Sequence, residues 1–447
     1  MMDQVMAMKW VRENIRGFNG DPGLVTIMGE SAGAASVGLH LLSEQSQDLF
    51  HRAICMSGSG LAPWAVYTNR DQAYNHTKEL GRKTGCYTDE KNQKPQEIID
   101  CLNIRTSIDI SEAVVVPDYG MRPPWAPVVQ GYYPYVFLQD DPRKLLQHGA
   151  LVTKVPVMQG VVKDEAGAFL YDSDPDYSLT LPEFYSTIRE FVKKENYSLE
   201  ESVVTAIGDS MIFEYTFHPD AENLTVVRQE MINLLSDHQF NAPNELSAKY
   251  HAQHGLDVFE YTFDYRADFS RYPNWTGVPH GIELNYVFGM PFLLQVYPEW
   301  EDYGMTNYTL DDRNVSDFMM NMWINFANYG EPVPDAYSNF PYLFKNVSRW
   351  YKYTTDRRFY LQINYTCEHL EDYLPHRCAY WNDYIPVASK MDLVTVTPTY
   401  HGLNQQQANA YIAATYSLGA AAFIMILALF VVCFLSAKKT DDGTEFD

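Results

Sequence analysis

Positive charge is in short supply in this 447-residue sequence. It contains 33 lysine and arginine residues against 57 aspartate and glutamate residues, which gives a formal net charge of −24. A protein that binds nucleic acid needs a basic face to neutralise phosphates, so this composition argues against a nucleic-acid partner. The acidity leaves two interpretations open: a repulsive surface that keeps the protein soluble, or a field that draws cationic substrates into a cleft.

Metal-binding motifs are also lacking. Neither a CxxC pair nor an HExxH segment occurs, so we expect no metal site and no cofactor. Of only six cysteines, Cys86 and Cys101 flank one polar stretch, and Cys367 and Cys378 flank another. In an oxidising compartment both spacings predict local disulfides. Cys55 lies in an apolar segment, where we expect a buried free thiol.

One long uncharged apolar run stands near the end of the chain. Residues 418–435 are 18 residues without a charge, and the segment before them extends the run. About 20 apolar residues span a bilayer, so the pattern predicts a transmembrane helix over 411–437. Two lysines follow at once, which places the tail 438–447 in the cytoplasm. We therefore expect a single-pass type I protein of the plasma membrane.

The rest of the chain then lies outside the cell, as a domain over 1–389 and a polar linker over 390–410. An extracellular location agrees with a high density of glycosylation sequons, some of which will be chance matches. The predicted sites are Asn75, Asn196, Asn223, Asn274, Asn307, Asn314, Asn346 and Asn364.

A serine stands among small residues in the segment TIMGESAGAASVG, residues 26–38. The apolar residues 24–28 predict a fully buried strand, and residues 33–42 have the spacing of a helix. Strand, sharp turn and helix together are the context of a nucleophile elbow, in which only small residues let the backbone fold so tightly. Ser31 is therefore a candidate nucleophile.

The remaining elements alternate in the same way, which predicts the α/β class with a parallel sheet. We expect helices over 3–16, 226–252 and 312–327, and strands over 52–56, 155–162 and 256–265.

The chain resembles the type-B carboxylesterase/cholinesterase family in five segments that occur in the family's order. They are GESAGAASVG, LFHRAICMSGS, GVVKDEAGAF, GVPHGIELNYVFG and WINFANYGEP. The resemblance implies the α/β-hydrolase fold, a mostly parallel sheet with helices on both faces. It also implies a serine hydrolase that cleaves small-molecule carboxylic esters through an acyl-enzyme. The positions that match the family's motifs are Ser31 as nucleophile, Glu165 as acid and His280 as base.

The same resemblance assigns supporting roles. The amide of Ala32 is expected to donate to the oxyanion, because the residue after the nucleophile does so in this fold. Glu30 resembles the glutamate that shapes the electrostatics near the serine, and Ser57 and Glu283 match buried polar groups behind the histidine. As for partners, we consider a homodimer of this chain as a candidate assembly.

Departures from the family pattern bear on activity. The family's early strands and its Gly-Gly oxyanion loop have no counterpart here, so we expect either the C-terminal part of a longer protein or a truncated gene model, and we expect the chain alone to be inactive. Met121, Pro123 and Ala168 stand where cholinesterases carry aromatic residues, which favours esters broader than those of choline. We consider two alternatives. One is a non-catalytic, neuroligin-like adhesion ectodomain, which the intact serine, acid and histidine disfavour. The other is an inactive scavenger.

Overall fold

The computed structural model describes residues 1–89, 93–114, 125–131, 135–195, 197–268, 270–293, 308–334 and 347–390. All of them belong to one unit, Met1–Met391. In this part of the chain no helix is long and apolar enough to cross a bilayer. The predicted transmembrane helix and cytoplasmic tail lie outside the described residues.

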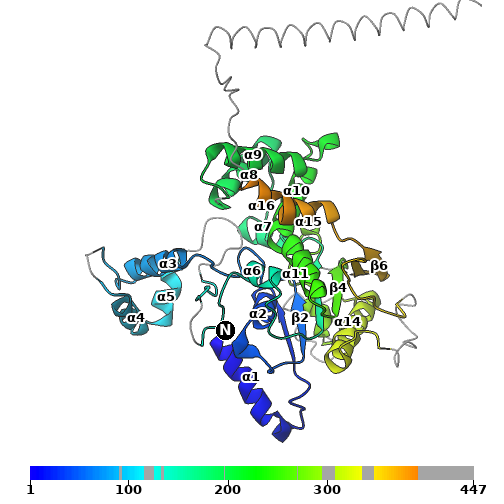
Figure 1. Cartoon of the computed structure of the whole chain (residues 1–447). Helices are drawn as coiled ribbons and strands as arrows, with labels where there is room; N and C mark the ends of the chain where they lie inside the picture. Colours follow the sequence, from blue (N-terminus) through cyan, green and yellow to red (C-terminus); the bar gives the residue numbers. More distant parts are fainter. Residues whose placement is uncertain are drawn as a thin grey trace, which may run out of the picture. The chain divides into compact units, whose positions relative to one another are not determined.

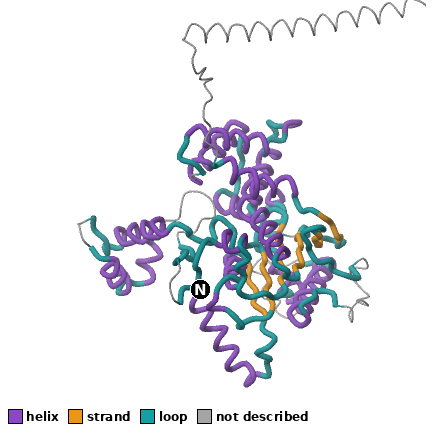
Figure 2. The backbone as a smooth tube through the Cα atoms, viewed as in Figure 1, coloured by secondary structure: helices purple, strands orange, loops and turns teal. Residues whose placement is uncertain are grey.

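A six-stranded sheet forms the centre of the unit (Figure 2). Its strands are β1 (Thr26–Glu30), β2 (Arg52–Met56), β3 (Val157–Val162), β4 (Val258–Phe263), β5 (Phe359–Ile363) and β6 (Glu368–Glu371). They lie side by side in chain order, with β1 to β5 parallel and β6 antiparallel to β5. Parallel neighbours need crossover connections, and helices supply these between the strands. The predicted α/β class is confirmed.

The α-helices are shown with the strands in Figure 1. They are α1 (Met2–Asn14), α2 (Ala32–His40), α3 (Arg70–Lys83), α4 (Pro95–Asn103), α5 (Ser107–Ala113), α6 (Pro142–Gln147), α7 (Gly167–Ser173), α8 (Leu181–Glu195), α9 (Glu201–Glu214), α10 (Leu224–Ser236), α11 (Ala242–Gln253), α12 (Leu284–Val287), α13 (Met290–Leu293), α14 (Leu310–Tyr329), α15 (Pro375–Ala379) and α16 (Ile385–Ala388). A π-helical turn, η4 (Asp237–Asn241), joins α10 to α11, so the predicted helix 226–252 is two helices in continuous succession.

Helices cover both faces of the sheet, as the alternation along β2 shows. Ala53 and Cys55 pack in a cluster with residues of α1, α2 and α11, whereas Ile54 and Met56 pack in a second cluster with residues of α14. Side chains of a strand point alternately to opposite faces, so a strand buried on both faces reads as an apolar run. The helices α3, α4 and α5 lie together beside this assembly (Figure 1).

The first strand departs from its prediction. It begins at Thr26 rather than Leu24, and it is not fully buried: Leu24 is 40% exposed and Met28 43% exposed. The reason is its position, since β1 is an edge of the described sheet and pairs only with β2. The sequence pattern gives the apolar character of the strand but not the number of its neighbours.

The predicted Cys86–Cys101 disulfide is present, with a Cα–Cα distance of 5.5 Å. It ties the end of α3 to α4 and closes the polar loop between them. Cys55 is a buried free thiol, as expected.

The predicted Cys367–Cys378 disulfide is wrong, because both thiols are free and buried. Cys367 directly precedes β6, and Cys378 lies in α15, beyond the other end of that strand. A four-residue strand spans about 13 Å, whereas bridged cysteines need Cα atoms within about 7 Å of each other. The two side chains accordingly pack in different apolar clusters.

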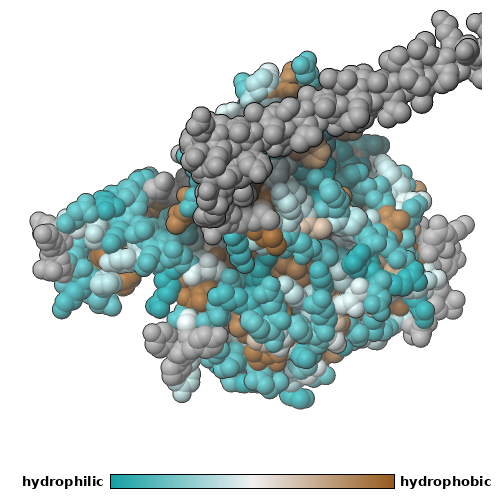
Figure 3. Space-filling view, turned by 45° about the horizontal axis from the view of Figure 1, so that its top comes forward, coloured by the Kyte–Doolittle hydropathy of each residue, from teal (hydrophilic) through white to brown (hydrophobic). Residues whose placement is uncertain are grey.

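The sequons differ in exposure. Asn75, Asn223 and Asn274 are exposed, while Asn314 and Asn364 are partly exposed. Asn196, Asn307 and Asn346 lie outside the described residues. The face drawn in Figure 3 is mainly hydrophilic, with apolar residues in scattered patches. Glycosylation stays a prediction.

Candidate active site

Ser31 occupies the single position between the end of β1 and the start of α2. Its backbone has φ 57° and ψ −121°, a conformation that side-chain-bearing residues adopt only at a cost. A Cβ atom on Gly29 would lie 2.2 Å from the backbone carbon of Gly33, and one on Gly58 would lie 2.3 Å from the Ser31 carbonyl oxygen. Glycine at positions 29 and 58 is therefore a steric requirement of this turn, whereas a Cβ atom on Gly33 would meet nothing within 4 Å.

Backbone hydrogen bonds hold the elbow in place. The Ser31 amide donates to the Met56 carbonyl at 2.9 Å, which fixes the turn against the end of β2. The Ser31 carbonyl accepts from the Ala35 amide at 3.0 Å and so starts α2. Ala32 is the exposed first residue of that helix, and its amide has no intrahelical acceptor. Such an amide can donate to an anion.

His280 and Glu165 form a short, buried contact. Glu165 stands in the turn between β3 and α7, is fully buried, and accepts from the Val162 amide at 2.9 Å through Oε1. Its other oxygen, Oε2, lies 2.6 Å from His280 Nδ1. The imidazole comes from the loop that precedes α12, and its side chain is 11% exposed. The carboxylate thus fixes the orientation of the ring.

The other ring nitrogen faces a second carboxylate. His280 Nε2 lies 3.0 Å from Glu30 Oε1, and in the part of the chain that the structure describes it has no hydrogen bond to Ser31 Oγ. Burial by itself lowers the pKa of His280, but the Glu165 and Glu30 carboxylates outweigh it and raise this pKa to about 10. The ring is therefore an imidazolium at neutral pH.

Ser57 and Glu283 form a fully buried pair behind this group. Ser57 follows β2 with φ 50°, and its hydroxyl donates to Glu283 Oε1 at 3.1 Å. Burial, followed by the charges of Glu165 and Glu30, raises the pKa of Glu283 to about 8. At neutral pH Glu283 is mostly protonated, so it does not add a third negative charge beside His280.

Sequence reasoning missed two aromatic residues at the site. The rings of Phe169 and Phe240 stack on each other, and their centroids lie 5.1 and 4.8 Å from the imidazole centroid. Phe169 follows Glu165 by about one helical turn, a spacing that could have indicated it. Phe240 comes from η4, far away in sequence, and no local signal marks it.

A cavity of about 290 Å³ lies beside the imidazole. Besides His280, its walls include Tyr265, Arg271 and Tyr286. Drug-sized ligands occupy about 300–1,000 Å³, so this space fits a smaller molecule. Among the described residues, no group of three or more His, Cys, Asp or Glu side chains is placed to hold a metal ion.

Comparisons with known proteins identify the family of the chain. The sequence profile of the carboxylesterase family matches residues 1–381. Acetylcholinesterase of Bungarus fasciatus is 33% identical over 396 residues, which cover 86% of this chain and 59% of that protein. The chain therefore spans about 59% of the length of the curated relative that it matches. From the family match and this identity, the chain belongs to the type-B carboxylesterase/cholinesterase family.

Proposed function

We propose that this chain carries the nucleophile, base and acid of a serine hydrolase that cleaves carboxylic esters. The observation that supports the proposal most strongly is the 2.6 Å contact between Glu165 and His280, whose other ring nitrogen faces Glu30, the residue directly before Ser31 in its strained turn. A serine hydroxyl is a poor nucleophile until an imidazole removes its proton, and a carboxylate keeps that imidazole in the required tautomer.

In the proposed reaction, Ser31 Oγ attacks the ester carbonyl carbon while its proton moves to His280 Nε2. The carbonyl oxygen becomes an oxyanion, which the Ala32 amide stabilises. When the tetrahedral intermediate collapses, His280 returns the proton to the alkoxide, and the alcohol leaves. Water then attacks the acyl-enzyme by the same steps and releases the acid.

Glu30 has to release the imidazole before this reaction can start. A general base must be unprotonated, whereas the contacts to Glu165 and Glu30 keep His280 charged at neutral pH. We infer that Nε2 exchanges Glu30 for Ser31 Oγ, which lowers the pKa of the ring and leaves it able to accept a proton.

The substrate class is proposed from one buried residue and from the resemblance. Ala168 is 5% exposed on α7, three residues past Glu165, at the position where the resemblance implies an aromatic residue in cholinesterases. Bulky-acyl or aryl esters are therefore expected to react at least as well as acetylcholine. Met121 and Pro123, which bear on the same preference, lie outside the described residues. We further propose display outside the cell on the membrane span 411–437.

The rate of the chain by itself is expected to be low. The proposal assigns the Ala32 amide to the oxyanion, and the family resemblance implies that full activity also needs further donors. Loss of one such donor costs about 10²–10³ in rate. An irreversible fluorophosphonate probe needs only one event per molecule, so labelling of Ser31 is a more sensitive readout than turnover.

The test is expression of the chain with an added signal sequence, followed by fluorophosphonate labelling and peptide mapping. The chain and the control Ser202→Ala, which changes an exposed serine, should both carry the label on Ser31. Ser31→Ala should carry none. A label on another serine would contradict the assignment. A folded chain that neither labels nor hydrolyses aryl esters would favour the adhesion alternative.

A further inference from the structure

The side chain next to the proposed acid holds the loop of the proposed base. Asp164 directly precedes Glu165 and is 7% exposed. Its amide donates to the Val278 carbonyl at 3.0 Å, and its Oδ2 accepts from the Val278 amide at 3.0 Å. These two bonds clamp the residue two positions before His280 onto the turn that carries Glu165.

The loop is shaped around this carboxylate. Gly277 has φ 63°, and a Cβ atom on it would lie 2.1 Å from Asp164 Oδ2, so no other residue fits there without movement. The Arg266 guanidinium donates to the Gly277 carbonyl and to the Tyr272 carbonyl, which holds the loop from its other side. By contrast, the direct backbone bond from the His280 amide to the Glu165 carbonyl is long, at 3.3 Å.

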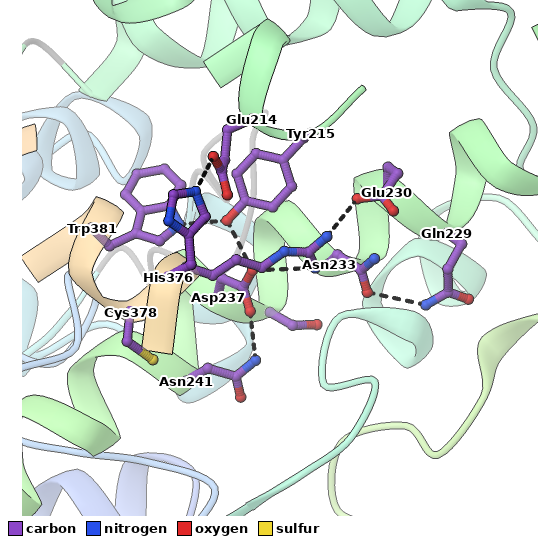
Figure 4. Close-up of polar contacts among 12 residues, drawn as sticks. Glu214, Tyr215, Gln229, Glu230, Asn233, Asp237, Asn241, His376, Cys378 and Trp381 are labelled. Atoms are coloured by element: carbon purple, nitrogen blue, oxygen red, sulfur yellow. Dashed lines mark hydrogen bonds and ion pairs between the residues drawn. The ribbon is translucent and has the colours of Figure 1, made fainter. Parts of the chain in front are cut away.

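Helix α10 holds the side chain of Asp164 in place. Gln229 Nε2 donates to Asp164 Oδ1 at 2.9 Å, and the hydroxyl of Ser236 accepts from the Ala166 amide at 3.0 Å. Two residues of one helix therefore form hydrogen bonds to the turn that carries Glu165, one on either side of that residue. Gln229 also donates to Asn233 at 3.2 Å, one turn further along the helix (Figure 4).

Buried polar contacts fix the end of α10 itself. Asp237 accepts from the Tyr215 hydroxyl and from Asn241, both at 2.8 Å, and Trp381 donates to Tyr215 at 2.7 Å (Figure 4). Glu230 lies 3.0 Å from the Arg377 guanidinium of α15. Helix α10, which holds the turn of Glu165, is thus anchored to the end of α9 and to the last helices of the unit.

We propose that Asp164 is a positioning residue: held by Gln229, it fixes the loop of His280 so that Nδ1 stays within hydrogen-bonding distance of Glu165. The role in catalysis rests on the proposed function, whereas the effect on the loop does not. A carboxylate suits the task because each of its oxygens accepts from one donor. An asparagine could accept from one of the two donors but would turn its amide toward the other.

The first experiment measures hydrogen exchange by mass spectrometry in the full chain. Asp164→Ala removes both acceptors, and Asp164→Asn removes one. Gly277→Ala disturbs the same contact from the loop side. All three should accelerate exchange in the peptide 276–282, most strongly for Asp164→Ala. The matched control Asp172→Asn changes an exposed aspartate of α7 and should leave this peptide unchanged.

The second experiment measures the rate of fluorophosphonate labelling at Ser31 against pH. A displacement of about 1 Å in a catalytic group can cost about 10²-fold in rate, so Asp164→Ala should label about 10²-fold more slowly. Its pH midpoint should also move down, because a looser Glu165 contact raises the pKa of His280 less. Asp164→Asn should recover part of the rate.

The outcomes separate the effect of Asp164 on the loop, its role in positioning His280 and the proposed function. Unchanged exchange in 276–282 would overturn the proposal, and so would faster exchange throughout the sheet, which would show general destabilisation. Local loosening with an unchanged rate and pH midpoint would overturn the role in positioning. Local loosening in a chain whose Ser31 never labels would refute the proposed function and leave only the effect of Asp164 on the loop.

Discussion

Glu30→Gln tests the electrostatics of the site most directly. The substitution keeps the size and shape of the side chain and removes one of the two negative charges beside His280. Glu30 Oε1 lies 3.0 Å from Nε2, and the two side chains are 19% and 11% exposed, so solvent screens the pair only partly. The pKa of His280, held at about 10 by Glu165 and Glu30, should fall.

The size of the effect follows from the geometry. Two unit charges about 4 Å apart interact by about 4 kcal/mol at an effective dielectric constant of about 20. Because both side chains retain some exposure, about half of that value is a cautious lower figure. Since about 1.4 kcal/mol corresponds to one pH unit, the pKa of His280 should drop by about 1.5–3. At pH 7.5 the neutral fraction of the ring should rise at least about 30-fold.

The assay is the rate of fluorophosphonate labelling at Ser31 between pH 5 and 11. In the parent chain the rate should rise toward pH 10, where His280 loses its proton. In Glu30→Gln the midpoint should lie lower by the stated amount, whatever happens to the plateau. Glu44→Gln, which changes an exposed glutamate, is the control. An unchanged midpoint in Glu30→Gln would refute the argument that Glu30 keeps the ring charged.

Stability should change with pH in the matching direction. The folded-state pKa of His280 lies above its usual value of 6.5, so its contribution is complete below about pH 6.5 and is lost as the pH rises through about 10. In Glu30→Gln the contribution should disappear at a lower pH. Thermal unfolding at pH 6, 8 and 10 in both chains would show whether the loss moves as stated.

Three further predictions concern the frame of the site. Gly29→Ala places a Cβ atom on the backbone of Gly33, so the elbow should not form; a variant that folds and labels at Ser31 like the parent would contradict this. Cys101→Ser opens the bridge to Cys86, whose sequence separation is 15, and should cost about 3 kcal/mol; limited proteolysis should then cut within α3–α5 and spare the sheet. Alkylation of the denatured, unreduced protein should modify both Cys367 and Cys378, and a peptide pair linked through them would contradict their assignment as free thiols.

The sequence by itself determined the features that depend on neighbouring residues. The elbow at Ser31 is largely predictable because the strand, Gly29 and the start of the helix are contiguous, although Gly58 and the Met56 carbonyl, which also shape the turn, come from a distant segment. The Cys86–Cys101 bridge is predictable for a similar reason, since a short polar loop brings its ends together. The family motifs then pointed to Glu165 and His280, which the structure places 2.6 Å apart.

Tertiary structure decided everything that depends on contacts between distant segments. The sequence named Glu30, but only the packing of the His280 loop turns Nε2 to Glu30 rather than to Ser31. The hydrogen bond between Asp164 and Val278 joins residues far apart in the chain, and so does the contact of the Phe240 ring with the imidazole. No local sequence pattern predicts either contact. Spacing favoured a bridge between Cys367 and Cys378, yet a strand separates them. Hydrogen bonds and disulfides need defined distances and angles, and long-range packing alone sets these between segments that the sequence keeps apart.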